Sequence, residues 1–569
     1  MPCSEQKKQF HNRGVISNSA LKRRNDGNFC DSGFYFWTYS NSARHTTHTK
    51  QRMKLKYCLN LISFTKNRLY ILMMFCLFLT SQIYANELKV GFAELPITPD
   101  LIDEWEDINN DAQFDPDIDK WTDLNGNNQF DAVWMAGFQN KRAAQGVKDD
   151  LMAVTAVIDD GQTRIAIISA DTIGLMRKFV LSVREDVPTE WGLDYIMVHA
   201  THNHEGPDTQ GLWGPSFLKS GVDAAYMELL KKGFISTLKK AIDNLEPAEM
   251  SQALIPTNPL TPIKDKRMPI VIDDDIRAIL FNRPDGSIIG SLINFGIHVE
   301  LTWDKNLELT SDVAGYLRSG ISDGIYYDDQ LIRAGLGGTT LWLTGNIGGL
   351  MTSGPTDPIY DPVLKKMLTK PSHAKARAYG YSLANSVIDA FNADDFKQSP
   401  NPSITVHSTE IELGIENFML SLGTLLGVID TDTKFSLMPP FIRYLSEVSF
   451  IQLGEATITG VPGELYPEIA VGGIENPLGA DYTIAPQEVP HLRSQFPDKL
   501  NLMVNLANDS IGYIIPKSEW DEDAPWIYGE VEETYGEVVS LGPNTAPIVY
   551  ENLVKLIEES KNQQRMDND

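Results

Sequence analysis

Two short apolar segments that end in polar residues constrain the fold of this chain more than any other feature. Residues 164–171 (RIAIISAD) and 195–201 (YIMVHAT) have the length and apolar continuity of buried strands. Residues 222–245 follow with apolar side chains at the spacing of an amphipathic helix. Strands and helices intermix along the rest of the chain, without a solenoid-type repeat. The sequence therefore predicts an α/β fold with mixed central β-sheet layers flanked by helices.

The chain has ordinary globular composition and enough residues for one large or two medium domains. Hydrophobic residues make up 42% of the 569-residue chain and charged residues 22%, which excludes wholesale disorder and a polytopic membrane protein. A polar loop at 395–403 is the place where a domain boundary could lie. We expect a single domain, with a division at this loop as the alternative.

The N-terminal region at 1–85 differs from the rest in cysteine content. All four cysteines lie there, so the remainder has no disulfide and no thiol nucleophile. Basic residues at 66–68 precede an apolar run at 69–79, which is typical of a secretory signal peptide, here over 53–85. The run is too short for a stable membrane span, and a membrane anchor is the alternative. We expect residues 1–52 to be a non-native extension and the protein to be secreted or periplasmic.

The region after residue 85 is strongly acidic. It holds 36 lysines and arginines against 73 aspartates and glutamates, whereas the whole chain has a formal net charge of −27. Such a surface repels nucleic-acid phosphates and anionic lipid head groups. No nucleic-acid partner is therefore expected, and the oligomeric state is left open.

An acidic insertion at 103–131 contains two copies of one motif, the first at 104–115 and the second at 120–131. Trp105 matches Trp121, and the triplet Gln-Phe-Asp recurs at 113–115 and 129–131. Both copies place side-chain oxygens on alternate residues of a tight loop, which suits Ca²⁺ and resembles the calcium loops of dockerin and thrombospondin type 3 repeats. The candidate calcium ligands are Asp107, Asn109, Asp111, Asp115, Asp123, Asn125, Asn127 and Asp131. A solvated insertion without metal is the alternative, because Asp and Asn are ordinary turn formers.

Three closely spaced histidines mark a candidate site at the end of the second apolar segment: His199, His202 and His204. In an extended strand, residues i and i+2 point to the same side, so His202 and His204 can face one cation or substrate. Histidines beside a turn that serve only structure are the alternative.

Three further fragments carry side chains of the same chemistry. His298 follows the apolar strand at 292–297, and it is more often a core residue than a ligand when taken alone. The turn at 461–464 (VPGE) presents a carboxylate, and 508–513 (NDSIGY) presents a phenol. Each has an ordinary structural explanation when considered singly.

In this order, these fragments resemble the neutral ceramidases, secreted zinc amidohydrolases that cleave the N-acyl bond of ceramide. The likeness extends over most of residues 88–560. The fragments that carry it are VGFAELPITP (90–99), MAGF (135–138), SAD (169–171), THNHEGP (201–207), INFGIHVELT (293–302), LTSDVAGYL (309–317), TGNIGG (344–349), VPGE (461–464) and NDSIGYIIP (508–516). Each fragment is weak alone, but their collinear order is specific.

The resemblance implies a catalytic zinc ion and an N-acylated, lipid-like small-molecule substrate. It implies that the zinc ligands are His202, His298, Glu464 and Tyr513. His204 would be a hydrogen-bonding or acid/base group that faces the substrate, with Asp171 and Asp312 as supporting residues. Two imidazoles, a carboxylate and a phenol suit a catalytic zinc that keeps room for water.

The chain also departs from the family pattern. Met351 stands where the family has a serine required for hydrolysis, and Ser353 would replace it if the loop shifts by two positions. Glu205 stands where a small serine is usual, either as a general base or as a salt-bridge partner at the rim. The family's arginine segment is replaced around 257–259, with Arg267 as a distant substitute, and its C-terminal immunoglobulin-like domain is not expected.

The leading hypothesis is a zinc-dependent amidohydrolase acting on ceramide or a related N-acylated lipid. A zinc hydrolase of another amide or ester is the first alternative, which Met351 and Glu205 favour. A catalytically inactive binding protein stabilised by calcium is the second.

Overall fold

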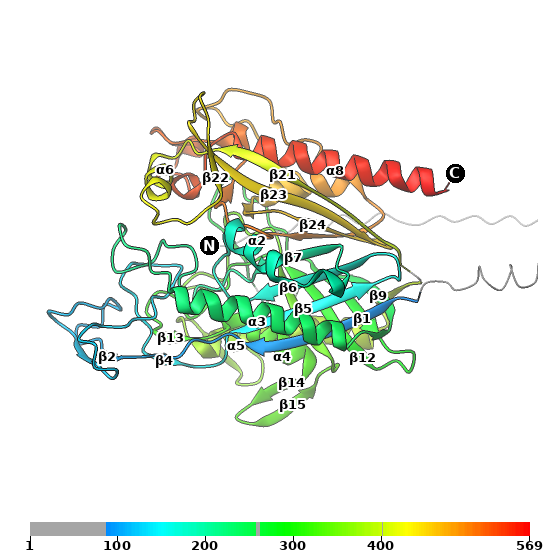
Figure 1. Ribbon diagram of the computed structural model, residues 1–569, viewed down its shortest axis with the longest axis horizontal. Helices are drawn as coiled ribbons and strands as arrows, with labels where there is room; N and C mark the ends of the chain where they lie inside the picture. The colour runs from blue at the N-terminus through cyan, green and yellow to red at the C-terminus, as the bar shows by residue number, and fades with distance from the viewer. Residues whose placement is uncertain (1–86, 258–261, 401, 569) are drawn as a thin grey trace, which may run out of the picture. The chain divides into compact units, whose positions relative to one another are not determined.

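The computed structural model describes residues 87–257, 262–400 and 402–568, and three β-sheets form the centre of this part (Figure 1). The strands of the first sheet, in spatial order, are β7 (Tyr195–Ala200), β6 (Arg164–Ala170), β5 (Met152–Asp159), β1 (Lys89–Pro96) and β8 (Glu246–Pro247). Those of the second are β16 (Thr339–Thr344), β12 (Ile288–Phe295), β11 (Ile276–Asn282), β9 (Glu249–Ile255) and β20 (Lys397–Ser399). Those of the third are β21 (Ile404–Gly414), β23 (Ile442–Leu453), β24 (Ala456–Gly460) and β26 (Leu500–Val504), with β22 (Thr433–Phe435) added beside β23.

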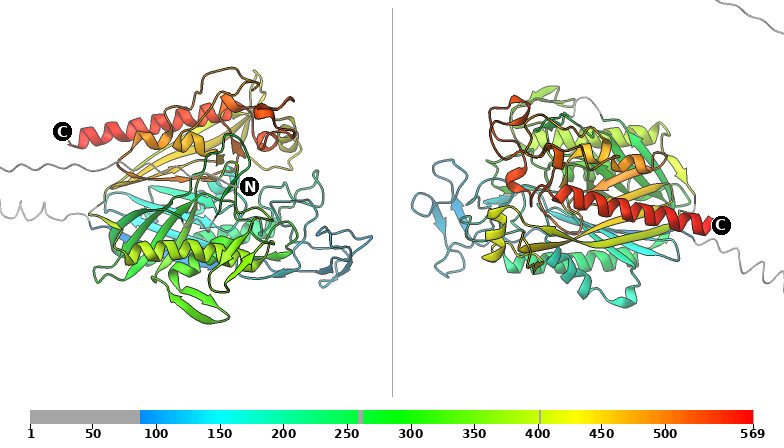
Figure 2. Two further views of the ribbon diagram at one scale, coloured as in Figure 1. Left: turned by 180° about the vertical axis from the view of Figure 1, so that it is seen from behind. Right: turned by 90° about the horizontal axis from the view of Figure 1, so that it is seen from above.

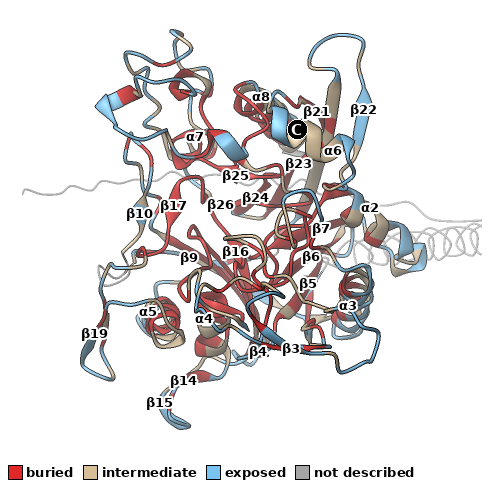
Figure 3. Ribbon diagram, turned by 90° about the vertical axis from the view of Figure 1, so that its left-hand side faces the viewer, coloured by how far each residue is buried: buried red, intermediate tan, exposed pale blue. Residues whose placement is uncertain are grey.

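One hydrophobic core joins the three sheets. Its buried side chains include Val154 of the first sheet, Ile279 of the second and Ile451 of the third. Figure 3 shows these strands as the buried interior of the molecule. Because burial contributes about 25 cal/mol per Å² of apolar surface, this shared core holds the sheets in a fixed relation.

Helices cover the outer faces of the sheets. α2 (Arg177–Asp186) and α3 (Ala224–Asp243) pack on the first sheet, and α4 (Asp312–Ser322) and α5 (His373–Asn392) pack on the second. α8 (Thr545–Asn568) packs against the third, as the view from above shows (Figure 2). The predicted α/β layering is confirmed, and the helix expected at 222–245 is α3.

Short elements complete the described structure. The remaining helices are α6 (Phe418–Leu425) and α7 (Pro467–Val471), and the paired short strands are β4 (Gly146–Val147) with β13 (Glu308–Leu309), β10 (Lys264–Asp265) with β17 (Leu350–Met351), β14 (Gly324–Tyr327) with β15 (Gln330–Ala334), β18 (Ile359–Asp361) with β19 (Lys366–Leu368), and β25 (Glu464–Leu465) with β27 (Tyr513–Ile514).

Each sheet contributes one parallel strand pair: β6 with β7, β12 with β16, and β24 with β26. Strands of a parallel pair end at the same edge, so the loops that follow them meet. The Asn508 backbone N–H donates to the Val198 carbonyl at 2.7 Å, and the Thr344 backbone N–H donates to His199 Nε2 at 2.8 Å. These bonds bring the edges of the three sheets together.

The acidic insertion forms a small unit of its own, which projects on the left of Figure 1. β2 (Glu104–Glu106) pairs with β3 (Lys120–Thr122) so that Trp105 lies opposite Trp121. The repeat-related rings of Phe114 and Phe130 stack with centroids 3.8 Å apart. The sequence repeat is therefore a symmetric pair in space.

The repeats close each other's loops. Asp119 accepts hydrogen bonds from the backbone N–H groups of Ile108 and Asp115 in the first loop. Asp103, which precedes the first copy, does the same for Leu124 and Asp131 in the second loop. Both carboxylates are buried, so each loop depends on a residue beside the other copy.

The described residues form one compact unit. The loop at 395–403 does not divide it, because β20 within this loop pairs with β9. The expected extension at 1–52 and signal peptide at 53–85 lie outside the described residues. Among the described helices, none combines the length and the apolar character needed to cross a membrane.

Candidate metal centre

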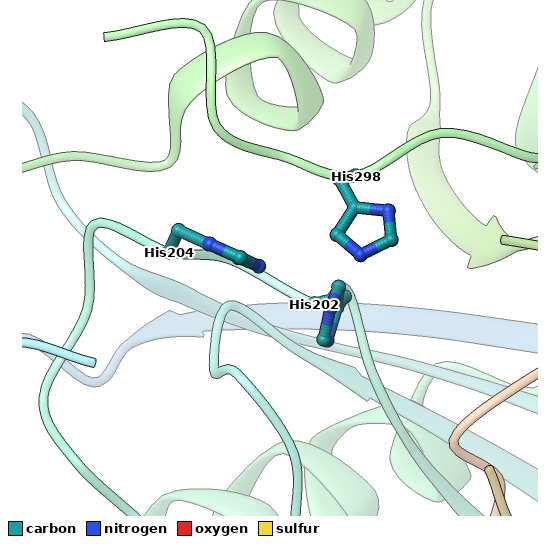
Figure 4. Close-up of side chains that lie close together, drawn as sticks. All are labelled: His202, His204 and His298. Carbon is teal, nitrogen blue, oxygen red and sulfur yellow. The ribbon is translucent and has the colours of Figure 1, made fainter. Parts of the chain in front are cut away.

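His202 and His204 lie in the turn that follows β7. The strand ends at Ala200, so the extended geometry expected for these histidines is wrong. His202 instead adopts a left-handed backbone conformation with φ of 61°, and the two rings lie 4.8 Å apart, centroid to centroid. The turn thus brings both side chains to one place, as predicted, by a different geometry (Figure 4). Such a backbone costs a non-glycine residue about 1–3 kcal/mol, which is typical of a functional site.

His199 belongs to the core instead. Its Nδ1 lies 3.2 Å from the Ser169 hydroxyl, and its Nε2 accepts the Thr344 N–H. Burial lowers its pKa to about 3, so the ring is neutral. Its role is to join the first two sheets behind the site.

His202 and His298 are both oriented by backbone carbonyls. Nδ1 of His202 donates to Ile173 O at 2.8 Å, and Nδ1 of His298 donates to Leu350 O at 2.9 Å. A ring whose Nδ1 carries the proton presents a lone pair at Nε2. Both Nε2 atoms therefore face the centre as acceptors.

Glu464 and Tyr513 complete this centre. They lie directly opposite each other in the parallel pair of β25 and β27. Glu464 Oε2 lies 3.2 Å from Nε2 of His298 and 3.5 Å from Nε2 of His202, and Tyr513 Oη lies 3.2 Å from Nε2 of His298. The structure thus brings together all four predicted zinc ligands.

The donor set fits a cation. Glu464 Oε2 is buried and has no hydrogen-bond partner in the described structure, although it faces two imidazole lone pairs. Three acceptors that face one another in a buried site repel unless positive charge lies between them. Two imidazoles, a carboxylate and a phenol are nitrogen and oxygen ligands of the kind zinc binds. The residues present therefore fit a zinc ion.

Burial and mutual contact shift the pKa values of the groups in this centre. Burial lowers the pKa of His202 to about 4, which keeps its imidazole neutral. Burial also disfavours charge on His298, but the nearby carboxylates of Glu464 and Glu300 outweigh this effect and raise its pKa. For Glu464, the nearby histidines and Tyr513 outweigh burial and lower its pKa.

His204 lies beside the four. Its ring centroid is 5.5 Å from that of His298, and neither ring nitrogen has a hydrogen-bond partner in the described structure. The nearest carboxylate is Glu300, 3.6 Å from Nδ1. His202, His204 and His298 each offer one ligand atom within 4.8 Å of the others, so His204 is also within reach of a metal ion. Burial and nearby positive groups hold the pKa of His204 well below its usual range.

Tyr535 is a site residue that the sequence did not indicate. Its hydroxyl lies 3.0 Å from that of Tyr513 and 3.9 Å from the sulfur of Met351. Its backbone carbonyl accepts hydrogen bonds from Tyr466 Oη and from Arg267 Nη1, which fix the segment. No motif marks Tyr535, because it lies well beyond the fragment that contains Tyr513, in a segment without strands.

Glu205 and Ser353, the other candidate catalytic residues, do not line the cavity beside the centre. The Glu205 carboxylate is fully buried and pairs with Arg142, and Asn306 donates to it at 2.8 Å. Glu205 therefore lies neither at the rim nor against the cavity. The hydroxyl of Ser353 is buried without a hydrogen-bond partner in the described structure.

Asp171 and Asp312 hold the loops of the site. Asp171 accepts hydrogen bonds from Arg318 and Thr201, and the latter begins the histidine turn. Asp312 accepts from the backbone and the hydroxyl of Thr302. Both carboxylates orient the backbone beside the ligands.

An apolar cavity of about 330 Å³ opens beside the centre. His202, His204, His298, Glu464, Tyr513 and Tyr535 supply its polar wall. Apolar side chains form most of the remaining lining, among them Phe138, Ile173, Met176, Leu212, Trp213 and Ile429, and the other polar residues there are Gln210, Thr424, Tyr444 and Ser510. A mostly apolar cavity with a few polar groups suits a molecule that carries a polar group on an apolar body.

The loops of the insertion lie in a different environment. Asp107 accepts hydrogen bonds from the backbone N–H groups of Asp111 and Ala112, and Asp123 accepts from those of Gly126 and Asn128. Asn127 donates to Asp131 at 2.7 Å. These side-chain oxygens therefore have donors within the protein, and calcium binding remains a prediction.

Comparison with known proteins connects this arrangement to one fold. No family model matches the sequence, and no curated protein matches it. The structure is similar to the crystal structure of neutral ceramidase from Pseudomonas aeruginosa, with a TM-score of 0.58 and 14% identity over 84% of this chain and 75% of that chain. It is equally similar to a ceramidase complexed with C2, with a TM-score of 0.58 and 14% identity over 84% of this chain and 76% of that chain. The chain therefore has the ceramidase fold that the sequence resemblance implied.

Proposed function

We propose that this protein is a zinc-dependent amidohydrolase that cleaves the N-acyl bond of ceramide or a related N-acylated lipid. The observation that carries the proposal is the buried cluster of Glu464, His202 and His298 beside a mostly apolar cavity, in which Glu464 Oε2 has no hydrogen-bond partner in the described structure. The neighbouring structures named as ceramidases support the substrate class.

The residues of the chain have distinct roles in this proposal. A zinc ion held by His202, His298, Glu464 and Tyr513 would polarise the amide carbonyl and make hydroxide available near neutral pH. His204, whose ring nitrogens have no partner in the described structure, would take a proton from the attacking water and return it to the leaving amine.

Tyr535 supplies the hydroxyl that Met351 cannot. Its Oη lies beside Tyr513 at the polar wall, so it donates a hydrogen bond to the oxygen on which negative charge develops. Arg267 positions this tyrosine through its backbone, and Glu205 positions the histidine turn through Arg142, which also donates to His204 O at 3.0 Å.

The experiment that tests the proposal measures zinc content and hydrolysis of a fluorescent N-acylsphingosine together. The purified protein should contain one equivalent of zinc and hydrolyse the substrate, and His298→Ala should lose both. His407→Ala is the matched control, because His407 lies on β21, outside the cavity lining. Full turnover by a protein treated with chelator would contradict the proposal.

A second candidate is a zinc hydrolase of another amide or of an ester. Met351, in place of a hydroxyl residue, favours it, because an ester needs less stabilisation of its leaving group than an amide does. Zinc without ceramide turnover, together with hydrolysis of a long-chain ester, would select this candidate.

Two sequence-based expectations join the proposal. The insertion at 103–131 would bind calcium in its two loops and gain stability from it. The signal peptide at 53–85 would direct the protein to the periplasm or the exterior, where calcium is plentiful.

A further inference from the structure

The segment at 417–441 exposes an unusual number of large apolar side chains. On α6, Phe418 is 74% exposed and Leu425 is 69% exposed, and in the hairpin between β22 and β23, Leu437 is 91% exposed. We call this set the apolar rim, and its members are Phe418, Met419, Leu425, Leu426, Phe435, Leu437, Met438 and Phe441. Figures 1 and 3 both show α6 and β22 side by side at one end of the structure. Clusters of exposed, large apolar side chains mark interaction surfaces.

The apolar rim is continuous with the cavity beside the metal centre. α6 directs Leu420 and Thr424 into the cavity lining, while Phe418 and Leu425 of the same helix face solvent. Ile429, between α6 and β22, also lines the cavity. One short segment therefore forms both an inner wall of the cavity and an outer apolar surface.

A second loop adds to this surface. Leu212 and Trp213 line the cavity, and Phe217 and Leu218 further along the loop are exposed. Gly211 brings the loop against the rim segment, because a Cβ at this position would lie 2.0 Å from the Val428 carbonyl oxygen. Two segments that line the cavity therefore also carry exposed apolar side chains.

Charge is confined to the base of the rim. The charged residues within 417–441 are Asp430, Asp432 and Lys434. They form ion pairs with Lys178, Arg177 and Glu412, respectively. These pairs fix the rim segment to α2 and β21 and leave no unpaired cation on it. The rim segment therefore offers an anionic surface no unpaired cation, and exposed Lys219 is the one cation of the second loop. This excess of apolar over basic side chains favours a lipid surface without net charge.

We propose that the apolar rim inserts into a lipid surface of zwitterionic head groups, so that the lipid substrate passes from that surface into the cavity. The inference rests on the proposed function, because it takes the cavity as the site of a lipid. The partner is an assembled lipid surface, and the contacts are the apolar side chains of α6 and of the β22–β23 hairpin.

Vesicle flotation with the full-length protein tests this directly. The protein should float with phosphatidylcholine vesicles, and Leu437→Asp/Met438→Asp should weaken this partition by at least about tenfold, since two large apolar side chains then become charged. Leu478→Asp is the matched control, because Leu478 is fully exposed outside the rim and should leave binding unchanged. Equal binding by the rim variant, or wild-type binding only to anionic phosphatidylserine vesicles, would overturn the proposal.

Kinetics separate this inference from the proposed function. The ratio of turnover of a vesicle-borne long-chain N-acyl lipid to that of a soluble short-chain analogue should fall about tenfold in the rim variant and stay constant in Leu478→Asp. Vesicle binding without turnover of either substrate would leave the rim assignment intact and contradict the proposed function. A dimer by light scattering that the rim variant converts to a monomer would assign the surface to a second copy and overturn the inference.

Discussion

The candidate metal centre and the acidic insertion both gather oxygen- and nitrogen-bearing side chains, but they differ in how these side chains find hydrogen-bond donors. In the insertion, Asp107 and Asp123 accept backbone N–H groups of their own loops. In the centre, Glu464 Oε2 is buried against two imidazole lone pairs without a donor. The carboxylates of the insertion are therefore stabilised without metal. The buried Glu464 oxygen in the centre needs a positive charge beside it.

The two regions also differ in their origin along the chain. The insertion is local, because all its ligand candidates lie between Asp107 and Asp131. The centre combines loops from three sheets, and Glu464 lies far from His202 in the sequence. The insertion needs only its own short segment to bring its candidate ligands together. The centre needs the packing of all three sheets.

The largest effect should come from Glu464→Gln. The amide replaces a carboxylate oxygen in the centre, so zinc affinity should fall by more than the roughly 100-fold that outer groups of metal sites contribute, and turnover should be lost. Metal titration and hydrolysis of a fluorescent N-acylsphingosine measure both effects. Glu455→Gln is the control, an exposed glutamate at the turn between β23 and β24. Undiminished zinc binding by Glu464→Gln would contradict the claim that Glu464, unlike the carboxylates of the insertion, requires a metal ion.

Tyr535→Phe should separate chemistry from metal binding. Removal of its hydroxyl should lower kcat roughly 100-fold, which is typical of a lost donor to developing negative charge, while the zinc content stays at one equivalent. Single-turnover kinetics with metal analysis would measure this. Unchanged kcat would show that the hydroxyl beside Tyr513 is only structural.

A third region contains two buried carboxyl groups whose mutual repulsion a proton relieves. Glu468 of α7 and Glu519 are buried carboxyl groups in contact, and burial with mutual repulsion raises the pKa of Glu468, while burial raises that of Glu519 to about 7. A raised pKa in the folded state gives stability that is full below the ordinary carboxyl pKa and lost as the pH rises through about 7.

Glu519→Gln should therefore stabilise the protein at pH 8 by about 1–3 kcal/mol and change little at pH 5, because the variant has no charge to bury. Thermal unfolding at the two pH values is the measurement, with the exposed Glu530→Gln as control. A variant whose loss of stability from pH 5 to pH 8 equals that of the wild type would refute the protonated pair.

The smallest effect on zinc content and turnover should come from a change in the insertion. Asp119→Ala removes the acceptor of two backbone N–H groups, which should destabilise the insertion by about 1–3 kcal/mol and leave zinc content and turnover nearly unchanged. Hydrogen exchange should show faster exchange at Ile108 and Asp115, and in the exposed control Asp117→Ala it should not. A large loss of turnover would mean that the two regions are coupled.

Much of the fold and the centre could be predicted from the sequence. Apolar runs that end in polar residues indicated strands whose ends carry the site, and collinear fragments resembled a family with the observed fold. The four predicted ligands meet because they follow strands of parallel pairs or lie within one. Periodicity and motif order carry this kind of information.

Contacts that depend on tertiary packing could not be predicted. Tyr535 reaches the site through a segment without strands, and Glu205 finds its partner Arg142 in a distant part of the sequence. The extended geometry predicted for His202 was wrong because the strand ends at Ala200 and the chain turns there. The repeat motif also did not indicate that Asp103 accepts a hydrogen bond from the second loop and Asp119 one from the first.

The most direct test of the centre is X-ray absorption at the zinc edge, with elemental analysis, on the wild-type protein and on His298→Ala. We expect one equivalent of zinc in the wild type, bound by nitrogen and oxygen ligands that include two imidazoles, and its loss in the variant. Absence of zinc from the wild type, or an unchanged spectrum in His298→Ala, would contradict the assignment of His202, His298, Glu464 and Tyr513 as a metal centre.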